Sequence, residues 1–92
     1  MISYRLANTE KYVIYDEKSS KEFASFVGSL GNTYVLSDAM QFNESEAKDF
    51  VRKWESANEG HLYPILVDSI NEAMMIKVLP VGQADKLVRF QE

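Results

Sequence analysis

The sequence predicts a single α+β domain with a mostly antiparallel sheet of four to five strands and two amphipathic helices on one face of that sheet. Three observations lead to this fold class. Short β-branched and aromatic runs are separated by turn residues, two segments carry an apolar stripe at helical spacing, and strand runs follow one another closely enough to form hairpins. Hairpins combined with amphipathic helices favour an antiparallel sheet that helices cover on one side.

The first two strands are expected near the start of the chain. Residues 2–6 alternate apolar and polar side chains, which is the period of a half-buried strand. After the turn residue Asn8, residues 11–16 form a β-branched and aromatic run. The two segments are therefore expected to pair as a hairpin.

Residues 19–32 are expected to form the first helix. Ser19 followed by Glu22 matches a capping box, and Gly31 supplies a left-handed stop. Gly28 inside this helix either costs about 1 kcal/mol relative to alanine or permits close packing against the sheet. An apolar stripe at helical spacing faces the sheet, made of Phe23, Phe26, Val27 and Leu30.

A short strand over residues 33–37 leads to the second helix, which is expected from the cap residue Asn43 to near Gly60. Asn43 and Glu46 form a second capping box. Trp54 is the expected core anchor of an apolar stripe that consists of Ala47, Phe50, Val51 and Trp54. Acid-before-base pairs four residues apart add support, namely Glu44 with Lys48 and Asp49 with Lys53.

A second hairpin is expected from residues 61–68 and 72–79, with Pro64 at an edge or a bulge because proline lacks a ladder donor. Residues 85–92 fit either a short strand or a helical turn, and the pattern does not decide between them. No linker separates these elements, so residues 1–92 are expected to form one domain.

The net charge of −4 is concentrated in the middle of the chain, where residues 38–72 hold eight acidic and three basic side chains. Such a field favours basic partners and repels nucleic-acid phosphates, so no direct nucleic-acid binding is expected. The apolar runs are too short for a membrane span, and the first residues lack the pattern of a signal peptide. The expected location is the cytoplasm.

The sequence assembles no recognisable catalytic, metal or cofactor site. It contains no cysteine, and its glycines form no phosphate-binding loop. His61 is the only histidine, and no nucleophile turn accompanies it. Residues 38–49 are rich in acids but lack the central glycine of a calcium loop. We therefore expect a non-enzymatic protein without metal or cofactor.

Two groups of side chains are candidate partner contacts. Tyr15 and Tyr34 fall on predicted strands, where amphipathic rings on an open sheet face often form protein interfaces. The second group is acidic and belongs to the second helix, where it is either a recognition surface or a solvated helix face. Its members are Glu44, Glu46, Asp49, Glu55 and Glu59.

Residues 34–51 also carry a composite pattern. A strand tyrosine leads into Ala-x-x-Phe, a cap residue, Glu-x-Glu-Ala and an amphipathic helix, at Tyr34, Ala39, Phe42, Glu44, Glu46, Ala47 and Phe50. This pattern resembles small accessory proteins of phages and prophages of Gram-positive bacteria. The resemblance implies a non-enzymatic protein that binds and modulates a host protein, for example a restriction or CRISPR effector with a basic nucleic-acid channel.

The alternative function is a small-molecule or peptide-binding module, with a pocket between sheet and helices lined by tyrosine, methionine and Trp54. A homodimer is compatible with either function, through an edge strand at 61–67 or the terminal segment 86–91.

Overall fold

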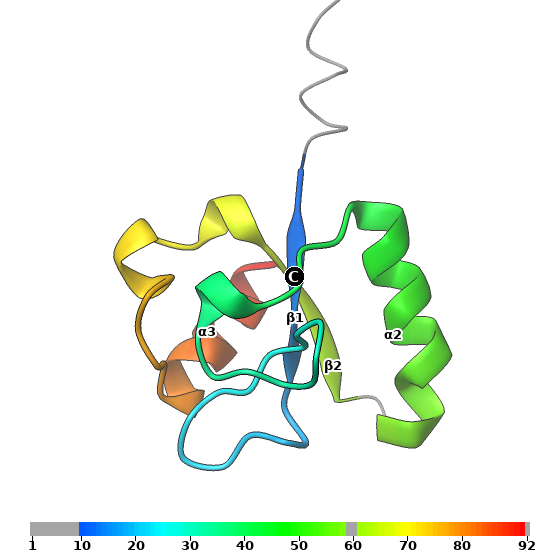
Figure 1. The fold of residues 1–92 in the computed structure, drawn as a ribbon, viewed down its shortest axis with the longest axis horizontal. Helices are drawn as coiled ribbons and strands as arrows, with labels where there is room; N and C mark the ends of the chain where they lie inside the picture. Colours follow the sequence, from blue (N-terminus) through cyan, green and yellow to red (C-terminus); the bar gives the residue numbers. More distant parts are fainter. Residues whose placement is uncertain (1–9, 59–60, 92) are drawn as a thin grey trace, which may run out of the picture.

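The computed structural model describes residues 10–58 and 61–91, with the side chains of 10–54 and 61–88. Its strands and helices along these residues are β1 (Tyr12–Asp16), α2 (Glu44–Asn58), β2 (Leu62–Leu66) and α3 (Val81–Gln91). Short 3-10 helices lie at Leu36–Asp38, Val67–Ser69 and Glu72–Met74. The two strands cross the middle of the molecule, with α2 on one side (Figure 1).

The sheet consists of β1 paired antiparallel with β2. The Glu17 amide donates to the His61 carbonyl just beyond the strand ends, so bonded pairs alternate from that point inward. Pro64 consequently falls opposite Ile14 in a non-bonded pair, and the N–H that it lacks would have faced away from β1. The expectation that Pro64 lies on an edge strand is confirmed.

The expected sheet of four to five strands is wrong, because β1 and β2 are the only strands among the described residues. Residues 33–37 and 72–79 form isolated bridges and 3-10 turns, although Val35 still pairs with Val78. β2 pairs with β1, and the expected hairpin with 72–79 does not form. Residues 2–6, the other expected strand, lie outside the described part of the chain.

Local hydrogen bonds explain why 72–79 is not a strand. The side chain of Asn71 accepts a bond from the Ala73 amide at 2.9 Å and starts a 3-10 turn there. The terminal segment, which the pattern left open, is helical, because α3 begins directly after Pro80 and runs to Gln91. Proline at the entry of a helix is common, since its fixed φ suits the first turn.

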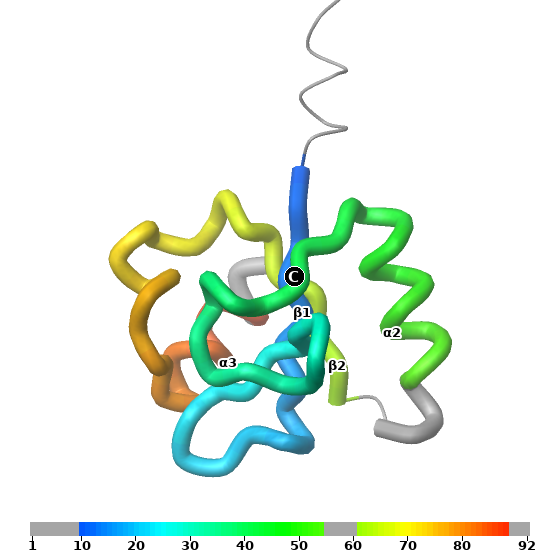
Figure 2. The backbone as a smooth tube through the Cα atoms, viewed as in Figure 1, coloured from blue at the N-terminus to red at the C-terminus, as the bar shows by residue number. Residues whose placement is uncertain are grey.

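The helix expected over 19–32 is also wrong. The carboxylate of Asp16 captures the Ser19 amide at 3.1 Å and the Ser19 hydroxyl at 3.0 Å, which makes a turn where a helix cap was expected. The chain then runs extended beside β1, as the Val27 amide donates to the Ile14 carbonyl at 2.9 Å. The irregular path from β1 to α2 can be followed in Figure 2.

Hydrophobic residues fill both faces of the sheet, so the expected placement of both helices on one face is wrong. On the α3 side, the core contains Val13, Tyr15, Phe26, Leu36, Ile65, Leu79, Ala84 and Leu87. On the α2 side, it contains Ile14, Val27, Phe42, Ala47 and Leu62. Neighbouring residues of β1 therefore belong to opposite cores, as the two-residue period of a strand requires.

The second helix forms as expected from its cap, and its described residues, Glu44–Asn58, extend close to the expected end. The Glu46 amide donates to Asn43 Oδ1 at 2.8 Å, and the Asn43 amide donates to Glu46 Oε1 at 2.9 Å. This reciprocal capping box satisfies two amide groups that the first turn would otherwise leave without partners.

Candidate interaction surface

The exposed face of α2 places the predicted acidic residues in two different situations. Glu44 forms an ion pair with Lys48 at 3.0 Å, and Asp49 forms one with Arg52 at 3.3 Å. The expected Asp49–Lys53 pair is thus replaced by a pair three residues apart. Glu46 is occupied by the capping box. These three carboxylates therefore make a mixed, internally paired surface and not a purely acidic one.

The other two predicted acidic residues lie beyond the side chains that the structure describes. Glu55 belongs to α2, but its side chain is outside the described set. Glu59 lies outside the described residues altogether. The described part of the acidic surface is therefore the first half of α2.

A polar groove of about 610 Å³ runs along this first half, lined by Glu10, Asn43, Glu44, Ser45, Lys48, Asp49 and Arg52. The charges along this groove act on the nearby Tyr12 hydroxyl. Burial first, and then the nearby Glu44 and Glu10 carboxylates, raise the pKa of Tyr12, while Lys48 opposes them. The groove accordingly presents both signs of charge, which suits a polar partner surface more than a single anion or cation.

An apolar hollow of about 370 Å³ lies between α2 and the loop that follows β1. Its walls include Val27, Gly28, Ser29, Gly31, Asn32, Met40, Phe50, Trp54 and Leu62. The buried Asp16 carboxylate lies in one wall, where Asn32 Nδ2 donates to it at 2.9 Å. A second hollow of about 340 Å³ adjoins the first, because Met40 and Phe50 line both. The sequence led us to expect a pocket lined by tyrosine, methionine and Trp54, and the first hollow has Met40 and Trp54 but no tyrosine. The loop that forms another of its walls was not foreseen, since it was expected to be a helix.

Trp54 is the largest side chain at the first hollow and is 43% exposed. The expectation that it anchors the core is wrong: its ring lies tilted beside that of Phe50, with centroids 6.3 Å apart, and Lys53 Nζ lies 5.6 Å from its ring centroid. Met40 is 37% exposed next to it. A half-exposed tryptophan and methionine at the rim of a hollow form the kind of surface that anchors protein interfaces.

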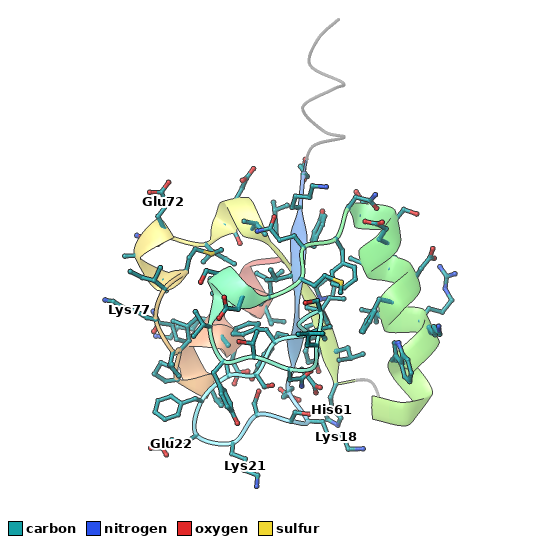
Figure 3. All side chains as sticks on the ribbon, in the orientation of Figure 1. Lys18, Lys21, Glu22, His61, Glu72 and Lys77 are labelled. Carbon is teal, nitrogen blue, oxygen red and sulfur yellow. The ribbon has the colours of Figure 1, made fainter. Side chains whose placement is uncertain are left out.

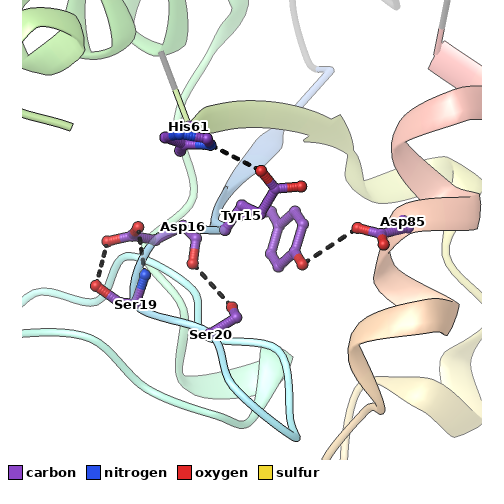
Figure 4. A network of polar contacts seen from close by, with 7 residues as sticks. Tyr15, Asp16, Ser19, Ser20, His61 and Asp85 are labelled. Carbon is purple, nitrogen blue, oxygen red and sulfur yellow. Dashed lines mark hydrogen bonds and ion pairs between the residues drawn. The ribbon is translucent and has the colours of Figure 1, made fainter. Parts of the chain in front are cut away.

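The two predicted tyrosine contacts differ. Tyr15 is fully buried on the α3 side, and its hydroxyl donates to Asp85 Oδ1 at 3.3 Å, so its side chain is not available to a partner (Figure 4). Tyr34 is 53% exposed. Tyr34 does not line the α2 hollow, and its neighbour Val35 forms a bridge with Val78.

His61 is paired with a carboxylate that the sequence did not suggest. Its Nδ1 lies 2.8 Å from Glu17 Oε1, at the end of β1, and both side chains are partly exposed (Figure 4). Their backbones are also bonded, which ties the start of β2 to the end of β1. The other polar groups in Figure 4 bond to one another: Tyr15 to Asp85, and Ser19 and Ser20 to Asp16. The His61–Glu17 pair therefore has a structural role, which is to join the two strands at the end of the sheet.

The described residues contain neither a cluster of metal ligands nor a membrane-spanning helix. In residues 10–58 and 61–91, no three histidine, aspartate or glutamate side chains gather where they could hold a metal ion. Neither described helix has the length and apolar character needed to cross a membrane. No family model, curated protein or solved structure matches the chain. The geometry of the surface is thus the basis for a functional proposal.

Proposed function

We propose that this chain is a non-enzymatic protein-binding protein that modulates or inhibits a host protein, as the resemblance to phage accessory proteins implies. The observation that carries the proposal is the apolar hollow rimmed by Trp54 and Met40, beside the charged face of α2. Tryptophan in a partly enclosed site, surrounded by polar residues, is typical of the energetic centre of an interface.

The charged side chains have a secondary role in this proposal. Glu44 and Asp49 are exposed and already paired within α2, and exposed pairs contribute little to affinity. They act on the rate of encounter and on the choice of partner, since charges at the border of an interface mainly steer association. The partner is therefore expected to offer an apolar side chain for the hollow and mixed or basic charge around it.

Affinity capture from a bacterial lysate, followed by mass spectrometry, tests the proposal. The bait is the wild-type chain, compared with a Trp54→Ser, Met40→Ser double variant and with Ile76→Ser as the matched control. Ile76 is 74% exposed and does not line the hollow, so its loss tests for non-specific apolar capture. We expect the same protein on wild type and control and its loss from the double variant. Equal capture by all three baits would contradict the proposed surface.

Charge reversal addresses the border of the interface. Glu44→Lys together with Asp49→Lys should slow association with the captured protein, and more strongly at low salt than at about 1 M salt, where the screening length is only about 3 Å. Association kinetics at both salt concentrations measure this effect. An unchanged association rate at low salt would show that the α2 charges do not contribute to the contact.

A second candidate function is a small-molecule or peptide-binding module, because the volume of the hollow falls within the range of about 300–1,000 Å³ that is usual for ligand sites. A thermal-shift screen with metabolites, nucleotides and short peptides tests it. A ligand present at 100 times its dissociation constant adds about 2.7 kcal/mol of stability. A shift that disappears in the Trp54→Ser, Met40→Ser variant would favour this function, and its absence across the screen would count against it.

A further inference from the structure

Leu30 projects from the surface beside the apolar hollow. It is 101% exposed, the highest value among the exposed large hydrophobic side chains described. It lies at the tip of a tight turn that Phe26 and Thr33 close with two mutual backbone hydrogen bonds, each of 2.8 Å. Turn tips usually carry glycine, asparagine, aspartate or serine, so a fully exposed leucine at this position needs a reason.

The turn that carries Leu30 depends on two glycines. Gly31 has a φ of +122°, a conformation that side-chain-bearing residues rarely adopt. A Cβ on Gly28 would lie 2.5 Å from the Gly31 carbonyl oxygen, so the two glycines allow the backbone to close tightly. The sequence places Leu30 between these two glycines, and the closed turn presents it as an apolar projection.

The hollow next to this projection is built partly from the same turn. Ser29 and Gly31, the two neighbours of Leu30, line the hollow together with Met40 and Trp54, whereas Leu30 itself does not. Leu30 therefore does not fill the hollow of its own chain. A cavity of about 150 Å³ lined by apolar groups is enough to hold a benzene molecule, so the hollow has room for a leucine side chain.

The charge of this region favours contact between identical chains. The whole chain carries −4, and two copies repel each other wherever their acidic surfaces meet. Residues 23–37 contain no charged side chain, and neither do residues 39–43. The turn and the Met40 wall of the hollow thus carry no charged side chain. The acidic residue that lines the hollow, Asp16, is buried, and its carboxylate accepts bonds from Ser19 and Asn32, so two copies can approach through this part of the surface.

We propose that a second copy of this chain covers the hollow, with Leu30 of each copy inserted into the hollow of the other. Because the projection and the hollow share one turn, a two-fold axis near that turn makes both insertions at once, as a self-complementary interface requires. The inference rests on the proposed function in one respect, since a host partner would use the same hollow and would have to displace the second copy.

Sedimentation velocity across a concentration series tests the dimer. Burial of one leucine corresponds to at least about tenfold in affinity, and two are buried, so Leu30→Asp should raise the dimer dissociation constant by about a hundredfold or more. Leu30 has no packing to lose, so the variant should retain the wild-type circular dichroism spectrum. Ile76→Asp is the control and should leave the dissociation constant unchanged.

A mixing experiment separates insertion from a general effect of charge. Leu30→Asp keeps an intact hollow, and Met40→Lys keeps an intact Leu30, so each variant should be monomeric alone. Mixed together, they should form a heterodimer, in which one leucine is inserted and the introduced aspartate meets the introduced lysine. Failure of the mixture to associate would overturn the proposed contact.

The outcomes separate this inference from the proposed function. A wild type that remains monomeric up to about 1 mM, or a dimer that Leu30→Asp leaves intact, would overturn the dimer. If such a protein still lost its lysate partner in the Trp54→Ser, Met40→Ser variant, the proposed function would stand. A Leu30-dependent dimer that captures no host protein would support the dimer and count against the proposed function.

Discussion

Replacing Gly28 by alanine should destabilise the protein, because the added methyl group meets backbone. The new Cβ would lie 2.5 Å from the carbonyl oxygen of Gly31, 3.6 Å from the Thr33 methyl group and 3.7 Å from the Asp38 carbonyl oxygen. Ordinary van der Waals contact begins near 3.4 Å, so the Gly31 carbonyl has to retreat by nearly an ångström. That carbonyl belongs to a closed turn and cannot rotate away as a flexible side chain would.

The expected cost is about 1–3 kcal/mol, the range found when a well-packed site is overfilled. Urea unfolding followed by the fluorescence of Trp54, the only tryptophan, measures it. Gly82→Ala is the matched control, because Gly82 lies in α3 with nothing within 4 Å of its added Cβ. This control should be stabilised by about 0.4–1 kcal/mol. A Gly28→Ala protein within about 0.5 kcal/mol of wild type would refute the tight turn that carries Leu30.

Two further predictions concern the helix cap and the buried tyrosine. Asn43→Ala should lower the free energy of unfolding in urea by about 0.5–2 kcal/mol. Glu46→Gln should stay near wild type, because its amide oxygen can still accept a hydrogen bond from the Asn43 amide. Equal losses in the two variants would contradict the cap. Burial, followed by the Asp85 carboxylate, raises the pKa of Tyr15 from 10.0 to about 12. The folded protein therefore favours the neutral phenol, so this contribution to stability is complete below about pH 10 and is lost as the pH rises towards 12. Urea unfolding from pH 9 to 12 should show a steeper decline for wild type than for Tyr15→Phe, and identical declines would contradict the burial.

The second helix could be predicted because its signals are local. The Asn43–Glu46 capping box and the Glu44–Lys48 pair depend on residues within one turn of each other, and both form. β1 and β2 could also be located, since both are short apolar runs that form strands whichever segment they pair with. Their pairing with each other was not predicted, because sequence proximity favoured hairpins with nearer segments.

The first predicted helix failed for a reason that periodicity cannot reveal. Phe26 and Val27 are both buried, but they enter opposite cores, because the segment is extended and covered on both faces. Two adjacent apolar residues suit that arrangement as well as they suit a helix stripe. The other members of the stripe, Phe23 and Leu30, are 42% and 101% exposed. Asp16, which diverts Ser19 from capping, acts from the preceding strand and lay outside the pattern considered.

The interaction surface was predictable only in part. The sequence placed acidic residues on an exposed helix, as Glu44, Glu46 and Asp49 are. It did not show that Trp54 remains half exposed, because its spacing with Ala47 and Phe50 is that of a buried stripe. The loop of residues 27–32 lines the same hollow as Trp54, and its path depends on backbone bonds between residues far apart in the sequence, such as that of Val27 with Ile14. Charged residues such as Glu72 and Lys77 lie across the molecule from α2 (Figure 3).

The position of β1 has a consequence for how the molecule opens. This strand is bonded to β2 along one edge, and along the other the Asp16 amide donates to Ser25 and the Val27 amide donates to Ile14. Its two faces contribute to separate cores, through Val13 on one and Ile14 on the other. Partial unfolding that released only one core would have to pull out the strand that also holds the other. The amide protons of β1 should therefore exchange with solvent only through global opening. A substitution in either core should lower the free energy of this exchange by as much as it lowers the free energy of global unfolding.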